Sequence, residues 1–288
     1  MYRAPSGHGV GLRHEHYAEL LDHGPQGVDW MEVISENLFG PGGRPWAVLE
    51  RVRREVPVVM HGVSMGLGNA AGVSEHYLDA LAEVIERVEP ALVSDHLCWG
   101  AHGGHHAHDL LPLPYTEGTL AHLVEQIGRV QERLGRRILV ENVSSYLQFR
   151  QSSIPEWEFL AELCQRADCA ILLDINNIVV SATNHGFDAK AYVDAIPADR
   201  VGQLHLAGHS QEDGYLLDSH IGPVPEVVWE LYGHALKRFG VRSTLVEWDA
   251  EVPSFAEVVA ESTRARELAE AHLAAMGADT AGAQDAAA

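Results

Sequence analysis

Short apolar runs rich in β-branched residues alternate along the chain with longer segments in which apolar residues recur every three or four positions. Eight such runs occur, at residues 9–12, 28–34, 56–63, 91–99, 136–143, 169–177, 201–209 and 243–249. Runs of this length, bounded by polar or turn-forming residues, are typical of buried strands. The pattern therefore predicts eight strands, each followed by a segment of different periodicity.

The intervening segments have the period of amphipathic helices. In 74–88, Ser74 can cap the first turn, and one apolar stripe runs from Tyr77 to Val88. Similar segments with Ser, Thr or Pro start signals lie at 116–134, 155–167, 225–239 and 254–273, and weaker ones at 14–22, 45–54 and 188–195. Eight strand-helix units in about 250 residues indicate an α/β fold, a single (β/α)8 TIM barrel. A doubly wound open sheet is the alternative, but no Gly-rich phosphate loop follows the first strand.

Six consecutive predicted strands end in side chains that can bind a metal ion. They are His61; Asp95 and His96; Glu141 and Asn142; Asp174, Asn176 and Asn177; His205 and His209; and Glu247 and Asp249. One such strand is ordinary, because a terminal carboxylate often caps a helix. In a barrel, however, the carboxyl ends of all strands meet at one rim. Carboxylates and imidazoles brought that close desolvate or repel one another unless a cation neutralises them, so the pattern predicts a metal site.

A loop after the seventh strand adds a second kind of signal. The segment 210–225 carries Asp218 and His220, a carboxylate and an imidazole one residue apart. Two solvated polar residues in a loop would be the simpler interpretation. The six strand ends instead favour a role in metal binding, because this pair of ligand types suits iron, zinc or manganese.

Composition narrows the class of protein. The net charge of the 288 residues is −21 with His counted neutral, which opposes binding to nucleic acid or anionic lipid. The 18 histidines are more than helix surfaces alone explain. Three cysteines without CxxC spacing argue against a disulfide framework. No apolar run is long enough to span a membrane and no secretion leader is visible, so we expect a cytoplasmic protein.

We expect one barrel domain over residues 1–272. The remaining segment, 273–288, is rich in Ala and other small residues. Such a composition cannot form a core, and it predicts a disordered tail.

The order of ligand types along the strand ends resembles the xylose-isomerase-like barrels, especially the trinuclear site of the endonuclease-four type. Longer motifs resemble the multinuclear non-haem iron-dependent oxidative enzymes, the family that includes the methanobactin and bufferin maturation enzymes. The resemblance covers residues 8 to about 260 and rests on "GVGLRHEHYAELL", "DWMEVISENLFG", "HGVSMGLG", "DLLPLPYT", "LVENVSSYL", "LLDINNIVVSATNHGFD", "LHLAGH" and "LVEWD".

The resemblance implies three sets of metal ligands. They are His61, His96 and Glu141 for one ion; Glu141 as a bridge, with Asp174, His205 and Glu247, for a second; and Asn177, Asp218 and His220 for a third. Asn177 stands where the endonucleases carry a histidine. Its neutral amide oxygen favours a harder, more exchangeable ion, which supports iron over zinc and leaves the occupancy of the third site open.

The chemistry implied by the resemblance is oxidative. Two or three iron ions, ferrous and ferric, would act with dioxygen as co-substrate on a cysteine of a ribosomally made precursor peptide, which a separate partner protein presents. Catalysis would depend on Glu141, Asp174, His205 and Asp218. The alternatives are a zinc-type nuclease or other hydrolase, a sugar isomerase, and a metal-binding protein without catalysis.

Several other polar residues receive weaker predictions. Asp95 and His209 are expected to orient ligands, and Glu36 and Asn37 to face the same rim. His185 is interpreted equally well as a ligand, a substrate contact or a loop histidine. The histidine-rich segment 102–108 is expected to form a mobile flap over the barrel mouth, anchored by Leu111, Pro112 and Pro114.

Overall fold

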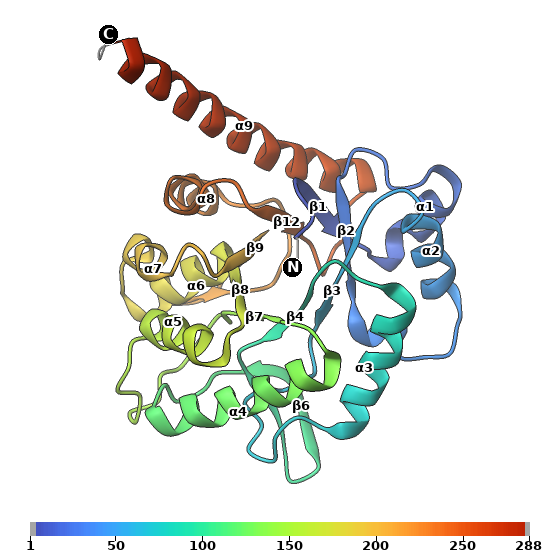
Figure 1. Ribbon diagram of the computed structural model, residues 1–288, viewed down its shortest axis with the longest axis vertical. Coiled ribbons are helices and arrows are strands. Elements are labelled where there is room, and N and C mark those ends of the chain that lie inside the picture. Colours follow the sequence, from blue (N-terminus) through green and yellow to red (C-terminus); the bar gives the residue numbers. More distant parts are fainter. Residues whose placement is uncertain (1–3, 286–288) are drawn as a thin grey trace.

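The computed structural model describes residues 4–285, with side chains placed up to residue 277. Eight parallel strands close into a barrel in the order β1-β12-β9-β8-β7-β4-β3-β2. Their bounds are His8–Gly11 (β1), Trp30–Ile34 (β2), Val58–Gly62 (β3), Val93–His96 (β4), Leu139–Glu141 (β7), Ala170–Asp174 (β8), Val201–Ala207 (β9) and Ser243–Glu247 (β12). The predicted TIM barrel is confirmed, with its strands forming a ring inside the helices (Figure 1).

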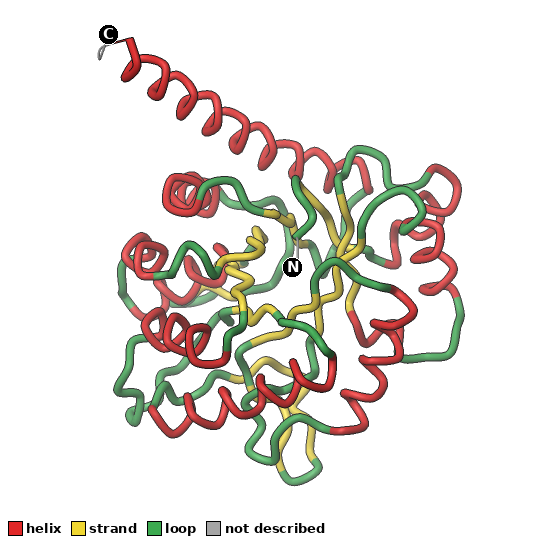
Figure 2. The backbone as a smooth tube through the Cα atoms, viewed as in Figure 1, coloured by secondary structure: helices red, strands yellow, loops and turns green. Residues whose placement is uncertain are grey.

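Helices surround the ring on the outside (Figure 2). They are α1 (Tyr17–His23), α2 (Arg44–Val52), α3 (Glu75–Val88), α4 (Glu117–Leu134), α5 (Glu156–Ala167), α6 (Ile175–His185), α7 (Ala189–Ala195), α8 (Glu226–Phe239) and α9 (Phe255–Asp285), with short 3-10 turns at His14–His16 and Ser35–Leu38. In α3 the stripe that includes Leu78, Leu81 and Val88 is buried, as its periodicity predicted.

Three local elements differ from the expectation. The predicted strand over 169–177 ends at Asp174, because the Asp174 side chain accepts a hydrogen bond from the N–H of Asn177 and caps α6 at once. Two hairpins rise from loops after β4 and β9. They consist of β5 (Trp99–His102) with β6 (His105–Leu111), and of β10 (Ser210–Gln211) with β11 (Leu216–Leu217).

The inside of the barrel is layered. An apolar plug fills one layer and is made of Trp30, Val59, Leu92, Leu139, Leu172 and Leu245. Side chains alternate along a strand, so the residue two positions further faces the same interior. Those residues are Glu32, His61, Ser94, Glu141, Asp174 and Glu247, all buried. The alternation thus places a polar layer directly above a dry floor.

Helix α9 passes through part of the segment for which the sequence predicted disorder. It is helical to Asp285, and its last turns project away from the barrel (Figures 1 and 2). Leu273 and Met276 are more than half exposed there, so Ala-rich helix propensity rather than packing explains the continuation. Neither α9 nor any other helix in residues 4–285 is apolar enough over sufficient length to cross a membrane.

Candidate metal centre

The first cluster joins three strands at the carboxyl end of the barrel. Nε2 of His61 on β3 and Nε2 of His96 on β4 lie 3.3 Å apart. Each also lies 3.2 Å from Oε2 of Glu141 on β7. Ligand atoms about 2.0–2.2 Å from one ion stand roughly 3.0–3.4 Å apart on neighbouring positions, so this triangle has the dimensions of one face of a coordination shell.

Hydrogen bonds fix the orientation of both imidazoles. Nδ1 of His61 lies 2.8 Å from Oγ of Ser94, and Nδ1 of His96 lies 3.1 Å from the carbonyl oxygen of Gly62. A nitrogen that faces a carbonyl must donate, which leaves Nε2 of a neutral His96 with its lone pair toward Glu141. Metal-binding histidines are commonly held in this way by a bond to the other ring nitrogen.

A second cluster lies deeper and shares Glu141 with the first. Nδ1 of His205 on β9 is 3.6 Å from Oε1 of Glu141 and 3.0 Å from Oε2 of Glu247. Ligand atoms of Glu141, Asp174 and His205 all lie within 4.8 Å of one another. The two oxygens of Glu141 therefore face different histidines, which is the arrangement that a bridging carboxylate requires.

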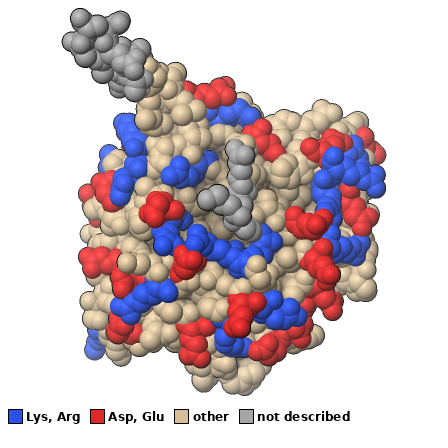
Figure 3. Space-filling view, in the orientation of Figure 1, with Lys and Arg blue, Asp and Glu red and all other residues tan. Residues whose placement is uncertain are grey.

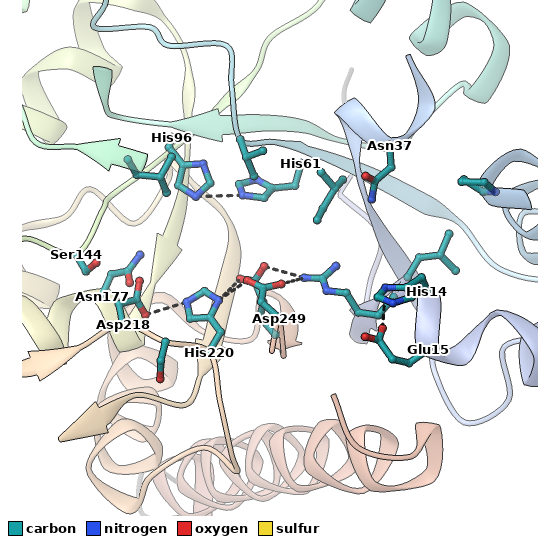
Figure 4. Close-up of a pocket in the computed structure, with 18 of the residues that line it drawn as sticks. His14, Glu15, Asn37, His61, His96, Ser144, Asn177, Asp218, His220 and Asp249 are labelled. Atoms are coloured by element: carbon teal, nitrogen blue, oxygen red, sulfur yellow. Dashed lines mark hydrogen bonds and ion pairs between the residues drawn. The ribbon is translucent and has the colours of Figure 1, made fainter. Parts of the chain in front are cut away.

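The third group stands nearer the mouth. Nε2 of His220 lies 2.9 Å from Oδ1 of Asp218, and its Nδ1 lies 2.8 Å from Oδ2 of Asp249. Ligand atoms of Asp174, His220 and Glu247 also fall within 4.8 Å of one another. In Figure 4, His61 and His96 face one another on one wall of the pocket, and Asp218 and His220 lie across from them near Asn177.

Burial shifts the pKa values of these groups in ways that suit a cation. It lowers the pKa of His61 far below its usual value and that of His96 to about 4, so both imidazoles are neutral. Burial also raises the pKa of Glu141 well above its usual value, and that of Asp174 to about 7. Desolvated carboxylates of this kind gain from an added positive charge.

The pKa values of two other histidines are raised instead of lowered. Burial lowers the pKa of His205, but the carboxylates of Glu32, Glu247 and Glu141 outweigh it and raise the pKa well above the usual value. The pKa of His220 is likewise raised by Asp218 and Glu247 against the effect of burial. In the metal-free protein, these two imidazoles can be protonated and so neutralise part of the negative charge of the neighbouring carboxylates.

The residues fit a metal ion by a further criterion. Among the described side chains, one oxygen on each of three predicted ligands is buried and accepts no hydrogen bond: Glu141 Oε2, Asp174 Oδ2 and Asn177 Oδ1. Unsatisfied buried acceptors are costly, and a coordinated cation satisfies them. Buried His, Glu and Asp clusters here can therefore bind metal ions.

A pocket of about 550 Å³ opens above these clusters. Its lining includes His61, His96, Asn177, Asp218, His220 and Glu247, together with Leu12, Ile34, Val63 and Leu110. A substrate side chain that enters this pocket meets the candidate ligands directly.

Some predicted residues lie apart from the clusters. Asp95 turns outward, since side chains alternate along β4, and accepts bonds from the N–H of Met65 and from the Tyr77 hydroxyl. Nδ1 of His209 is hydrogen-bonded to Asn176, and Asn176 donates a hydrogen bond to Oδ1 of Asp218. His209 therefore acts on Asp218 only through Asn176. His185 pairs with Ser145 Oγ at 2.7 Å and belongs to none of the described clusters.

The β5–β6 hairpin also differs from the expected flap. Its tip residues are exposed, and His102 and His106 line a cavity against α3 rather than the metal pocket. Its far end does reach the mouth, where Leu110 lines the pocket. The anchor is in part as predicted, because Trp99 donates to the carbonyl oxygen of Pro112.

Two charged residues of the site were missed in the sequence. Glu32 on β2 is 1% exposed and accepts a bond from Gln203 Nε2 at 2.7 Å. Arg13 bonds Glu247, Asp249 and the carbonyl oxygen of Trp248, so it holds the end of β12. In the sequence, each of these residues is a single charge beside or within an apolar run, as in "DWMEVI" and "GVGLR". A search restricted to the residues at strand ends does not find them.

Known proteins resemble the chain over nearly its whole length. The family model described as "RiPP precursor modification enzyme MbnB/TglH/ChrH" matches residues 7–270. A UPF0276 protein of Anaeromyxobacter sp. (strain Fw109-5) is 61% identical over 270 residues, which cover 94% of this chain and 95% of that protein.

Solved structures resemble the chain in fold alone. The IOLI protein with a bound zinc atom has a TM-score of 0.61 at 11% identity and covers 92% of this chain and 99% of its own. A xylose isomerase-like TIM barrel fused to 4-hydroxyphenylpyruvate dioxygenase has a TM-score of 0.54 at 14% identity, over 91% of this chain and 42% of the fusion protein. The xylose-isomerase-like architecture predicted from the sequence is thus confirmed.

Proposed function

Because the chain belongs to the MbnB/TglH/ChrH family of RiPP precursor modification enzymes, we propose that it oxidises a cysteine of a ribosomally made precursor peptide with dioxygen. Two or three iron ions at the barrel mouth are the proposed cofactor, and a separate protein presents the peptide. The observation that carries the proposal is Glu141, whose two oxygens face different histidines above a dry floor.

The proposed ligand sets follow the clusters. His61, His96 and Glu141 hold one ion, and Glu141 with Asp174, His205 and Glu247 holds a second. Asn177, Asp218 and His220 hold the third, because the Asn177 amide oxygen accepts no hydrogen bond from a described residue and lines the same pocket as the other two. Bound iron with an open position supplies a place for a thiolate and for dioxygen, and a route for electrons between them.

The protein's own residues position the peptide and manage protons. The pocket admits a cysteine side chain between the His61–His96 wall and the Asp218–His220 wall. Where the third ion is absent, the carboxylate of the Asp218–His220 pair, whose facing atoms are 2.9 Å apart, can take up the proton that the thiol loses on entry. The plug of Trp30, Leu172 and their neighbours keeps water from the opposite side.

The electrons balance without another oxidant. Removal of one pair of hydrogens from the peptide gives two electrons to dioxygen, which leaves as hydrogen peroxide. Removal of a second pair completes the reduction to two waters. Either outcome lowers the mass of the peptide, which distinguishes it from hydrolysis or isomerisation.

Metal reconstitution tests the choice of cofactor. Metal-free protein is loaded anaerobically with ferrous iron or with zinc, and oxygen uptake is followed with the cysteine-bearing peptide encoded beside the gene, together with any partner protein encoded there. We expect uptake only with iron and peptide together. Activity restored by zinc alone, with cleavage of abasic DNA at physiological salt, would instead support the nuclease interpretation.

A further inference from the structure

The structure contains a groove that leads away from the metal pocket, here called the hairpin groove. One wall is formed by His106, His108 and Leu110 of β6, and the other by Val63, Ser64 and Gly66. We propose that it binds the extended segment of the precursor peptide next to the modified cysteine. This inference rests on the proposed function, and it assigns the part of the protein that selects the peptide.

The groove adjoins the metal pocket. Val63 and Leu110 line both cavities, which measure about 460 Å³ and 550 Å³. A peptide whose cysteine reaches His61 and His96 therefore has the groove beside it, across Val63 and Leu110. A peptide substrate needs such an exit, because the pocket alone has room for little more than the reacting residue and its neighbours.

Strand β6 offers the main-chain contacts that an extended peptide uses. It pairs only with β5, in a two-stranded sheet, so no other strand within residues 4–285 covers its second edge. An uncovered edge presents N–H and C=O groups to which another strand can add. From His106 to Leu110 the strand spans at most roughly 13 Å, because His108 has a φ of 53° and interrupts the extended backbone.

Both walls are held by polar contacts. Oε1 of Glu36 accepts hydrogen bonds from the N–H groups of Val63 and Ser64 and from the Tyr77 hydroxyl. Oδ1 of Asn69 accepts from the N–H groups of Gly100 and Ala101, which ties β5 to the opposite wall. The groove is thus formed before binding, and ordering it costs the peptide little.

A second exposed surface is the alternative candidate for binding the peptide. The rings of Tyr146 and Tyr215 pack edge to face and are each more than 40% exposed. Tyr146 reaches the metal pocket through its hydrogen bonds with Ser144 and with the N–H of Asp218, but neither tyrosine lines it, whereas Val63 and Leu110 line both the groove and the pocket. The shared lining of Val63 and Leu110 favours the groove for the peptide and leaves the tyrosine pair for another contact.

The experiment uses iron-loaded protein and the cysteine-bearing peptide encoded beside the gene, with any partner protein encoded there. Ser64→Trp fills the groove without touching a candidate ligand, and Leu147→Trp is the matched control on the tyrosine side, where Leu147 is 51% exposed. We expect Ser64→Trp to raise KM for the peptide at least tenfold while iron content and kcat stay near wild type. Leu147→Trp should leave KM unchanged.

A second set of three variants guards against misfolding of the loop. His106→Ala and His108→Ala alter the groove wall, and His105→Ala alters the same strand outside it. Hydrogen exchange should show protection of the amides of residues 105–111 when peptide binds, lost in Ser64→Trp and kept in His105→Ala. Truncating the peptide beside the cysteine should remove the difference in KM between wild type and Ser64→Trp.

The outcomes separate the two proposals. If wild type modifies the peptide, but Ser64→Trp has an unchanged KM and β6 gains no protection, the groove assignment is overturned and the function stands. If β6 is protected by a peptide that is never modified, the groove assignment is supported and the oxidative function fails.

Discussion

The carboxylate of Glu32 lies 3.2 Å from Nε2 of His205, whose other nitrogen, Nδ1, lies 3.0 Å from Glu247. The imidazole is thus held between a carboxylate that belongs to no predicted ligand set and one that does. When Nε2 carries the ring proton, Glu32 accepts it, and Nδ1 is left free to face a cation between Glu141 and Glu247.

Glu32→Gln should therefore weaken metal binding without unfolding the barrel. The amide keeps the shape of the side chain but loses the charge that orients and polarises His205. We expect a 10- to 100-fold loss of affinity for the ion at His205, measured by competition with a chelator. Glu36→Gln is the matched control, because Glu36 bonds the 63–64 loop instead of a candidate ligand. Equal affinities in the two variants would contradict the orienting role.

Glu141→Gln tests the bridge. Its oxygens face His61 and His96 on one side and His205 on the other. The variant should lose metal from two sites together, whereas His220→Ala should empty chiefly the outer site. Elemental analysis of the purified variants decides the matter, and unchanged metal content in Glu141→Gln would show that the carboxylate does not bridge.

The apolar plug should stabilise the fold independently of metal. Leu172 is fully buried two residues before Asp174, so Leu172→Ala leaves a cavity beneath the polar layer. We expect the free energy of unfolding of the metal-free protein to fall by about 2–5 kcal/mol in urea. Leu147→Ala, at an exposed position, should change it by no more than about 0.5 kcal/mol.

Glu156 provides a pH test away from the metal site. Burial raises its pKa from 4.5 to about 7, while a hydrogen bond from the Tyr192 hydroxyl partly opposes the shift. Between these two values the folded protein binds more protons than the unfolded chain, so the contribution of Glu156 to stability falls as pH rises.

Glu156→Gln keeps an acceptor for Tyr192 and cannot ionise. Relative to wild type, the variant should gain on the order of 1–3 kcal/mol of stability between pH 5 and pH 8. Urea unfolding at the two pH values measures this gain. A difference between the proteins that did not vary with pH would show that Glu156 has an ordinary pKa in the folded state.

The sequence predicted the barrel and most of the cluster, because strand period and position at a strand end are local properties. The loop pair Asp218 and His220 was predicted to bind metal from its ligand types, but only the family resemblance assigned it to a third ion, because a loop's own pattern does not show where a side chain points. Glu32 was not predicted as a site residue because it lies within a strand, and only the closure of the barrel brings it to His205. The sequence pattern did not predict α6, because Asp174 both ends β8 and caps the helix, so no loop separates the two elements.

The central claim is tested most directly by the mass of the peptide. The cysteine-bearing peptide encoded beside the gene is co-expressed, in iron-replete cells and with any partner protein encoded there, with wild type or with Glu141→Gln. We predict a peptide that has lost one or two pairs of hydrogens at its cysteine with wild type only. An unmodified peptide beside wild-type protein of verified iron content would contradict the proposed oxidation.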